Sequence, residues 1–267
     1  MSSQTFSLKS LQTLRRFLKQ RLVLPECEHA PNTFEADEMP EPDSLAGLSS
    51  LFDQGGLTHV ADSAPNTNGR WFISTVDASN VIKQLPGLTF HPNYCLVTYL
   101  YRVQKANISH GRAATWAIAK RLSSTCQLEA ALDLAGDHTT PPAPDGALLN
   151  YMTAVAGDLT AGSFLKASIL QRELQEFGRS GQFNRWQHHR LIDAIPQQCG
   201  WQWRIQQPKN LAPTVHHLAN GKLAVEFYTC RVAPPIGIFR HIDRYPAKSY
   251  VAKSNNQPIA APARSSP

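Results

Sequence analysis

The chain has 267 residues, and 42% of them are hydrophobic, which is enough to build a core and excludes a protein that is disordered throughout. Its five cysteines are scattered and include no CxxC pair, so they indicate reduced thiols in a cytoplasmic protein rather than a disulfide framework. Basic residues interrupt the first apolar stretch, and prolines interrupt the longest uncharged run, residues 84–101. We therefore predict neither a secretory signal nor a transmembrane helix.

Charge is sorted into separate stretches of the chain. Residues 1–24 hold five basic and no acidic side chains, whereas residues 25–62 hold nine acidic side chains and no lysine or arginine. The remaining residues carry 21 basic against 11 acidic side chains, a net charge of +10. This sorting predicts that the basic part meets something negatively charged, which is either the acidic stretch itself or another molecule.

The first element is a basic amphipathic helix. Ser7 is a suitable N-cap, Pro25 ends the pattern, and we predict a helix that ends near Leu24. Leucines at three- and four-residue spacing form a single stripe along it: Leu8, Leu11, Leu14, Leu18 and Leu22.

Residues 25–69 are rich in Pro, Gly, Ser, Asn and acidic residues, and this composition predicts an acidic linker. Its only apolar patch predicts a short helix around residues 44–52. We expect a single folded domain over residues 70–253 and a disordered tail over residues 254–267, where proline recurs.

The first half of the predicted domain combines strands and helices. Residues 71–76 and 94–103 are rich in β-branched and aromatic residues and predict two strands, of which the second is central in its sheet. Residues 78–85 predict a short helix. The stretches 113–122 and 126–134 have a helical period and predict two more helices.

The second half begins with three predicted helices, over residues 147–156, 161–177 and 182–195. Residues 201–206 then predict a strand. Asn220-Gly221 lies between two strand-like runs and is the strongest short signal for a β-hairpin, because both central residues of a type I′ turn need a positive φ. The fold class is therefore α+β, with a mixed or antiparallel sheet formed by strands from both ends of the domain and covered by the helical middle segment.

Two carboxylates on the predicted helix 161–177 are candidates for acid–base chemistry. Glu173 and Glu176 lie one turn apart and can act as paired carboxylates, although Arg172 and Glu176 also have the spacing of a surface ion pair. His188, on the next predicted helix, can join them. His188 and His189 are adjacent, and adjacent side chains diverge, so we predict no metal site.

A second candidate site is the dense polar cluster that follows Pro234-Pro235, over residues 239–245, which we predict to be a loop. Here His241 with Asp243 can serve as a general base, and Arg240 with Arg244 can bind an anion. The alternative is an exposed loop held by salt bridges.

Eight side chains are predicted to contact a partner, because they combine positive charge with a neighbouring aromatic ring or lie on the basic helix: Arg15, Arg16, Lys19, Arg185, Trp186, Arg190, Arg240 and Arg244. The partner predicted first is an acidic protein. Nucleic acid is an alternative, and residues 6–24 are also suited to peripheral contact with an anionic membrane surface.

The function predicted from the sequence is a non-catalytic interaction, assembly or regulatory factor that binds an acidic partner through its basic surface and an N-terminal helical arm. The first alternative is a hydrolase with a site formed by residues 239–245 and the helix that carries Glu173 and Glu176. The second alternative is a nucleic-acid-binding protein. No motif in the chain identifies a cofactor.

Overall fold

The structure is a computed structural model, and it describes residues 2–29, 69–105, 108–183, 185–197 and 199–263. Most of the predicted acidic linker, including the short helix expected around residues 44–52, lies outside the described residues.

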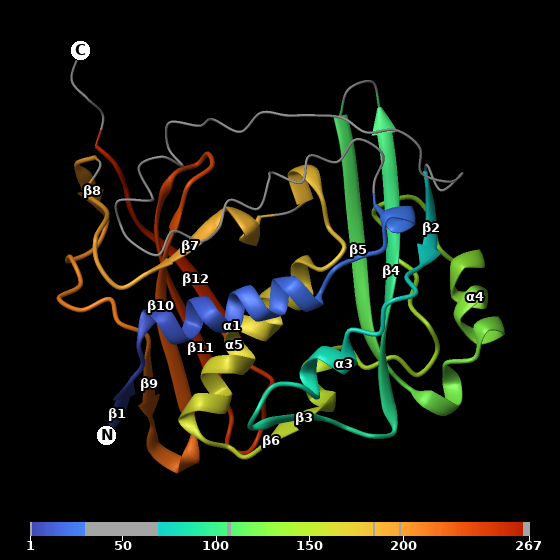
Figure 1. The fold of residues 1–267 in the computed structure, drawn as a ribbon, viewed down its shortest axis with the longest axis horizontal. Coiled ribbons are helices and arrows are strands. Elements are labelled where there is room, and N and C mark those ends of the chain that lie inside the picture. The colour runs from blue at the N-terminus through green and yellow to red at the C-terminus, as the bar shows by residue number, and fades with distance from the viewer. Residues whose placement is uncertain (1, 30–68, 106–107, 184, 198, 264–267) are drawn as a thin grey trace.

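The largest sheet is antiparallel and has seven strands within the described residues (Figure 1). Its strands are β1 (Ser3–Thr5), β7 (His189–Ile192), β8 (Trp201–Trp203), β9 (Thr214–His217), β10 (Leu223–Arg231), β11 (Gly237–Tyr245) and β12 (Lys253–Pro262). The order is β1-β9-β10-β11-β12-β8, and β7 pairs with the second half of β10. The sheet thus joins the N-terminal strand to strands from the last third of the chain.

Two smaller sheets complete the strand structure. One has the order β2-β4-β5 and is formed by β2 (Arg70–Ile73), β4 (Tyr94–Lys105) and β5 (Ile108–Ala119). The other pairs β3 (Leu88–Phe90) with β6 (Val155–Gly157). The central position predicted for the strand at residues 94–103 is confirmed, because β4 lies between β2 and β5.

The helices are α1 (Leu8–Arg21), α3 (Ser79–Ile82), α4 (Thr125–Asp133) and α5 (Ala161–Glu176), with short 3-10 helices at Glu26–Glu28, Lys120–Leu122, Tyr151–Ala154, Gly181–Phe183, Trp186–His188 and Ala219–Gly221. Figure 1 shows α1 and α5 lying across the large sheet, with the three-stranded sheet beyond them. The main hydrophobic core lies around α5. No helix in the described ranges is long and apolar enough to cross a membrane.

The N-terminal helix forms as predicted, but it is docked onto the rest of the domain. The Ser7 hydroxyl accepts a hydrogen bond from the Ser10 backbone N–H at 3.3 Å and caps its first turn. Leu11 and Leu18 are fully buried in the main core, and β1 pairs with β9 just before the helix. The leucine stripe is therefore used within the chain.

The predicted hairpin is also confirmed. β9 and β10 pair in antiparallel register, with His217 opposite Leu223. Asn220 and Gly221 have φ values of 60° and 69°, the left-handed region that the Asn-Gly pair predicts.

Three predicted helices are wrong. Residues 113–122 belong mainly to β5, which pairs along its whole length with β4, so strand pairing overrides a local pattern rich in alanine. Residues 182–195 form two 3-10 turns followed by β7, and residues 147–156 form a loop, a 3-10 turn and the start of β6. The helices predicted at residues 126–134 and 161–177 match α4 and α5.

Two further corrections concern the C-terminal part. Residues 239–245 are not a loop but most of β11, which lies between β10 and β12. Residues 253–262 are not disordered: they form β12, which pairs with β11 on one side and β8 on the other. The polar composition of this strand suits its exposed first half, and the backbone ladder holds it in place.

The beginning of the predicted acidic linker is tied to the domain. The buried Glu28 carboxylate accepts hydrogen bonds from the Ser74 hydroxyl at 2.6 Å and from the Thr75 backbone N–H at 2.7 Å. The Arg102 Nε donates to the Glu28 carbonyl at 3.0 Å. Residues 25–29 are thus an anchored segment, and the part of the linker beyond them lies outside the described residues.

Candidate functional site

Several of the predicted site residues meet in a polar layer between α5 and the inner face of the large sheet. Side chains alternate along a strand, so His241 and Asp243 of β11 point to the same face, as does Thr229 of β10. On β12, Asn256 is the direct partner of His241. Helix α5 covers this face and contributes Arg172 and Glu173.

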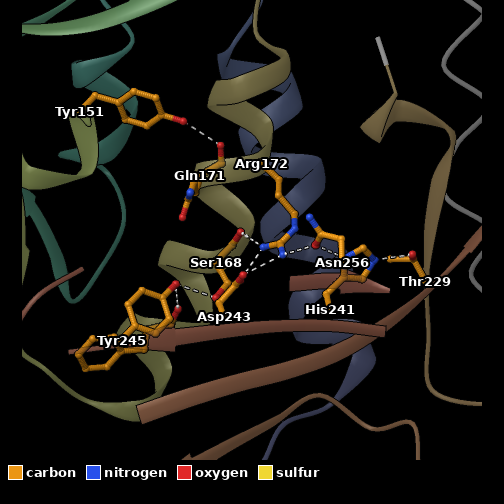
Figure 2. A network of polar contacts seen from close by, with 10 residues as sticks. Tyr151, Ser168, Gln171, Arg172, Thr229, His241, Asp243, Tyr245 and Asn256 are labelled. Carbon is orange, nitrogen blue, oxygen red and sulfur yellow. Dashed lines mark hydrogen bonds and ion pairs between the residues drawn. The ribbon is translucent and has the colours of Figure 1, made fainter. Parts of the chain in front are cut away.

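A buried ion pair in the layer joins Arg172 to Asp243. The two guanidinium nitrogens Nη1 and Nη2 donate to Asp243 Oδ2 at 2.6 Å and Oδ1 at 2.9 Å (Figure 2). Arg172 also donates to the Ser168 carbonyl at 2.8 Å and to Asn256 Oδ1 at 2.9 Å. Asp243 is 0% exposed, so this two-pronged pairing offsets its loss of hydration.

A chain of hydrogen bonds continues from Asn256 across the strands. Because Asn256 Oδ1 can only accept, the His241 Nδ1–H donates to it, at 2.7 Å. The opposite ring nitrogen, Nε2, must then accept from the Thr229 hydroxyl at 2.8 Å. The Thr229 oxygen in turn accepts from His189 Nδ1–H at 2.8 Å. Arg172 thus fixes the tautomer of both rings through shared partners.

Both histidines are held in the neutral form. Burial, with Arg172 nearby, lowers the pKa of His241 to about 3. Burial, with His241 and Arg15 nearby, lowers the pKa of His189 to about 2. Near neutral pH, each ring therefore stays neutral and serves as a hydrogen-bond donor and acceptor that takes up no proton.

A second ion pair connects α1 to the same layer. Arg15 Nε donates to Glu173 Oε1 at 2.8 Å, and the Trp186 indole N–H donates to the same oxygen at 2.6 Å. Arg15 also donates to the carbonyls of Trp186 and His189, and its guanidinium lies 4.7 Å from the centre of the Trp186 ring. The two buried cations are therefore matched by two buried carboxylates.

Aromatic rings pack tightly around the polar chain. Phe227 stacks on His241 with ring centres 4.8 Å apart, and Trp186 meets the same ring edge-on at 5.5 Å. Trp186 also stacks on His189 at 5.4 Å. Trp186 is only 7% exposed and His241 only 2%, so both rings lie in the interior, whereas Asn256 at the end of the polar chain is exposed.

Two predicted catalytic residues lie beside this layer rather than in its hydrogen-bonded chain. Burial raises the pKa of the Glu176 carboxyl, while hydrogen bonds from the backbone N–H groups of Trp186 and Arg185 act against this rise. Burial and the nearby Arg231 and Arg190 lower the pKa of the half-buried His188. The structure thus places Glu173, His241 and Asp243 in one layer. Glu176 and His188 lie outside its hydrogen-bonded chain, so the five residues do not form one catalytic site.

A group of basic residues lies where β7 pairs with the end of β10, and we call it the cationic edge. It consists of three arginines, with the ring of His188 among them: Arg185, His188, Arg190 and Arg231. Arg231 is the strand partner of His189, and Arg190 is the partner of Cys230. Burial and the nearby Arg185 lower the pKa of Arg231. Arg185 is exposed, and the other three side chains are partly buried.

The other predicted partner-binding residues are spread over different faces. Arg240 lies on the outer face of the large sheet and donates from Nε to Glu226 Oε1 at 2.8 Å. Arg244 is exposed near the end of β11. Arg16 is exposed on α1 and Lys19 partly buried, whereas Arg15 is buried.

Sequence reasoning missed Thr229, Asn256 and the central position of Arg172. Once residues 223–231 and 237–245 are read as paired strands, the two-residue spacing of His241 and Asp243 places them on one face. No comparable signal identifies Asn256, because its strand has a polar, proline-containing sequence.

Comparisons with protein-family models, with curated protein sequences and with solved structures give no match. In the described ranges, no group of three or more His, Cys, Asp or Glu side chains is placed to hold a metal ion. The functional conclusion therefore rests on the geometry of this chain alone.

Proposed function

We propose that this protein is a non-catalytic binding factor for an acidic protein partner and that the cationic edge is its main contact surface. The observation that carries the proposal is the gathering of three arginines, Arg185, Arg190 and Arg231, around one strand junction, with Arg185 exposed. Like charges this close repel one another, and an acidic partner relieves that repulsion. We retain the prediction of a cytoplasmic location, with which the five free cysteines agree.

The polar layer, whose side chains are bonded to one another, supports a binding factor over a hydrolase. A general base must reach a substrate proton at hydrogen-bond distance, and its pKa should lie near the working pH. Both ring nitrogens of His241 are already bonded within the protein, and the pKa of its ring is far below neutrality. Glu173 and Asp243 are each paired with a buried arginine. We therefore interpret these residues as the structural centre of the domain.

The position of Trp186 favours a protein partner over nucleic acid. Proteins that bind single strands stack exposed aromatic rings on the bases. The Trp186 ring is covered by Arg15 and His189 and is buried. Trp186, the aromatic residue next to the cationic edge, is therefore not exposed for a base to stack on.

The docked N-terminal helix changes where the partner is expected to bind. The sequence suggested an N-terminal arm, with contact to a membrane surface as an alternative. Since Leu11 and Leu18 are buried against the core, the apolar stripe of α1 is not displayed. The proposal therefore places the partner on the body of the domain.

The test is a charge-removal experiment on the intact chain. The probe is a fluorescein-labelled 20-residue polyglutamate, and binding is measured by fluorescence anisotropy at two salt concentrations. We expect Arg185→Gln with Arg231→Gln to weaken binding at least tenfold. The matched control, Lys120→Gln with Arg121→Gln, removes two exposed positive charges elsewhere and should change the affinity less than twofold.

Equal weakening by both double variants would reject the cationic edge as the contact surface. A 20-nucleotide single-stranded RNA serves as the competing probe. If the RNA binds more tightly than polyglutamate, and does so through Arg185 and Arg231, the nucleic-acid alternative replaces the proposal.

A further inference from the structure

A cavity of about 350 Å³ lies between β5 and α5, on the side of α5 that faces the three-stranded sheet. Residues 113–116 of β5 form one wall. Gln171, Leu174 and Gln175, which lie on one face of α5, form the opposite wall. We call this space the β5 groove.

The β5 wall of the groove is an interrupted sheet edge. β5 pairs with β4 on one side only, since the sheet order is β2-β4-β5. On the other side, Ser180 bridges Gly111 and Leu148 bridges Ala117, both in antiparallel sense. The edge between these two bridges is the part that lines the groove.

The backbone groups on this edge can be assigned from the alternation of a strand. Gly111 exchanges hydrogen bonds with Ser180, and the Ala117 carbonyl accepts from Leu148, so both residues direct their backbone groups away from β4. Residues at two-residue intervals point the same way, so the N–H and C=O groups of Ala113 and Thr115 also point into the groove. In the part of the chain that the structure describes, these four groups have no backbone partner.

The helix wall adds an independent sign of a missing ligand. Gln171 is 8% exposed, and its Oε1 is buried without a hydrogen-bond donor among the described residues. Such an acceptor is destabilising unless a donor reaches it. Arg179 lines the groove next to Ser180, and its side chain is exposed. At the other end, Leu149 is 99% exposed beside the Leu148 bridge.

We propose that the β5 groove binds a short extended peptide from another protein, which pairs with Ala113 and Thr115 as an added antiparallel strand. Two peptide residues, spaced two apart, then exchange four backbone hydrogen bonds with β5. The two bridges that flank the groove are both antiparallel to β5, and the peptide occupies the position between them in the same sense.

The direction of the peptide fixes its chemistry. Since β5 runs from Gly111 toward Ala117, an antiparallel peptide has its C-terminal end near Arg179 and its N-terminal end near Leu149. A carboxylate at the C-terminal end is attracted to the Arg179 guanidinium, and an apolar side chain at the N-terminal end covers Leu149. The bridges at Ser180 and Leu148 close both ends, so the long β5 of a second copy does not fit.

This inference does not depend on the proposed function. The β5 groove and the cationic edge share no residue, so the same experiment can include Arg185→Gln with Arg231→Gln as an independent control. That variant should bind groove peptides as the wild type does.

The experiment begins with selection from a library of random hexapeptides with free C-termini on the immobilised full-length protein. The most enriched peptide is then synthesised as the free acid and as the C-terminal amide. The decisive variant is Ala113→Pro, which removes one N–H from the free edge without touching the β4 ladder, a position where proline is tolerated. Arg179→Gln tests the carboxylate contact, and Arg121→Gln is its matched control.

We expect enriched peptides to carry an apolar residue at the N-terminal side and a carboxylate at the C-terminal end. Ala113→Pro should weaken binding at least tenfold while keeping the thermal melting temperature within a few degrees of the wild type. Arg179→Gln should lose the preference for acid over amide, whereas Arg121→Gln keeps it.

The proposal is overturned if no peptide is enriched, if Ala113→Pro retains wild-type affinity, or if Arg179→Gln behaves like Arg121→Gln. A wild-type dimer that Ala113→Pro abolishes would assign the groove to a second copy and would also overturn it. If Ala113→Pro fails to fold, amide hydrogen exchange on the wild type replaces it. Bound peptide must then protect the amides of Ala113 and Thr115.

Discussion

Arg15 and Glu173 are 158 residues apart in the sequence and form a buried ion pair, with 2.8 Å between Nε and Oε1. Removing one partner leaves the other charge buried without compensation, which costs about 3–5 kcal/mol. We therefore expect Arg15→Met to lower the free energy of unfolding by about this amount, measured by urea denaturation.

A second variant separates the charge from the packing. Arg15→Met with Glu173→Gln leaves no unpaired charge and keeps an acceptor for the Trp186 indole N–H. This double variant should recover at least half of the stability lost by Arg15→Met. Arg16→Met, at an exposed position on the same helix, should change stability by no more than about 0.5 kcal/mol. Equal losses for Arg15 and Arg16 would contradict the role of the pair.

Thr229 joins the two buried histidines. Thr229→Val keeps the shape of the side chain but leaves His189 Nδ1 and His241 Nε2 without their shared partner. At about 1–3 kcal/mol for each of the two unsatisfied groups, we expect a loss of about 2–6 kcal/mol. Thr229→Ser keeps the hydroxyl and should lose about 1 kcal/mol. Chemical denaturation of both variants checks this, and a neutral effect of Thr229→Val would contradict the assigned chain.

The same histidines predict how stability depends on pH. Their folded pKa values, about 2 for His189 and about 3 for His241, lie below the ordinary value near 6.5. The unfolded chain therefore binds more protons below pH 6.5, so their contribution to stability is complete above that pH and falls as the pH drops. The two sites together should lower the free energy of unfolding by about 3 kcal/mol between pH 7.5 and 5.5.

The control for this pH dependence is His241→Gln, which removes one of the two sites. Its stability should fall by about half as much over the same interval. If the wild type and His241→Gln lost the same stability between pH 7.5 and 5.5, His241 would not be held neutral by the fold.

How much of the fold the sequence predicts depends on whether the signal is local. The Ser7 cap, the leucine stripe and the Asn220-Gly221 turn act over a few residues, and all three appear in the structure. β5 and β12 are different, because their own sequences do not favour a strand. Each forms a strand because neighbouring strands pair with its backbone: β4 pairs with β5, and β11 and β8 pair with β12.

The candidate site shows the same limit. Glu173, His241 and Asp243 were chosen from their residue types, and the structure places them in one layer. Their sequence neighbours did not reveal that Arg15 and Arg172 neutralise the two carboxylates. The register of β10, β11 and β12, which decides these contacts, is set by backbone pairing and not by a motif.

Gly178, just after α5, lies close to Leu100 of the three-stranded sheet. Its φ is +77°, and a Cβ added there would clash with Leu100 Cδ2. We expect Gly178→Ala to lower the free energy of unfolding by about 2–3 kcal/mol. The matched control is Gly162→Ala on α5, where the nearest atom to an added Cβ is 3.8 Å away. That change should stabilise by about 0.4–1 kcal/mol, and thermal denaturation of both variants checks the contrast.

The acidic stretch gives a prediction that keeps the anchored Glu28 intact. A variant with neutral amides replaces five acidic residues by Gln or Asn: Glu35, Asp37, Glu38, Glu41 and Asp43. If this stretch shields the basic body, the variant should elute from heparin at a higher salt concentration than the wild type. The five substitutions remove negative charge, so the net charge of the chain also rises. If heparin binds at the cationic edge, adding Arg185→Gln and Arg231→Gln should cancel most of the shift in the elution salt concentration. An unchanged elution point would remove the shielding hypothesis.

The pairing of β1 with β9, about 210 residues later, has a consequence for how the chain folds during its synthesis. Strand β1 and helix α1 are made well before their partners α5, β7 and β9, which all lie in the second half of the chain. The leucine face of α1 must therefore remain uncovered at least until α5 has been translated, about 140 residues later. Contacts of such long range slow folding and expose apolar surface to aggregation, so assembly of this domain should benefit from a chaperone that holds the early helix.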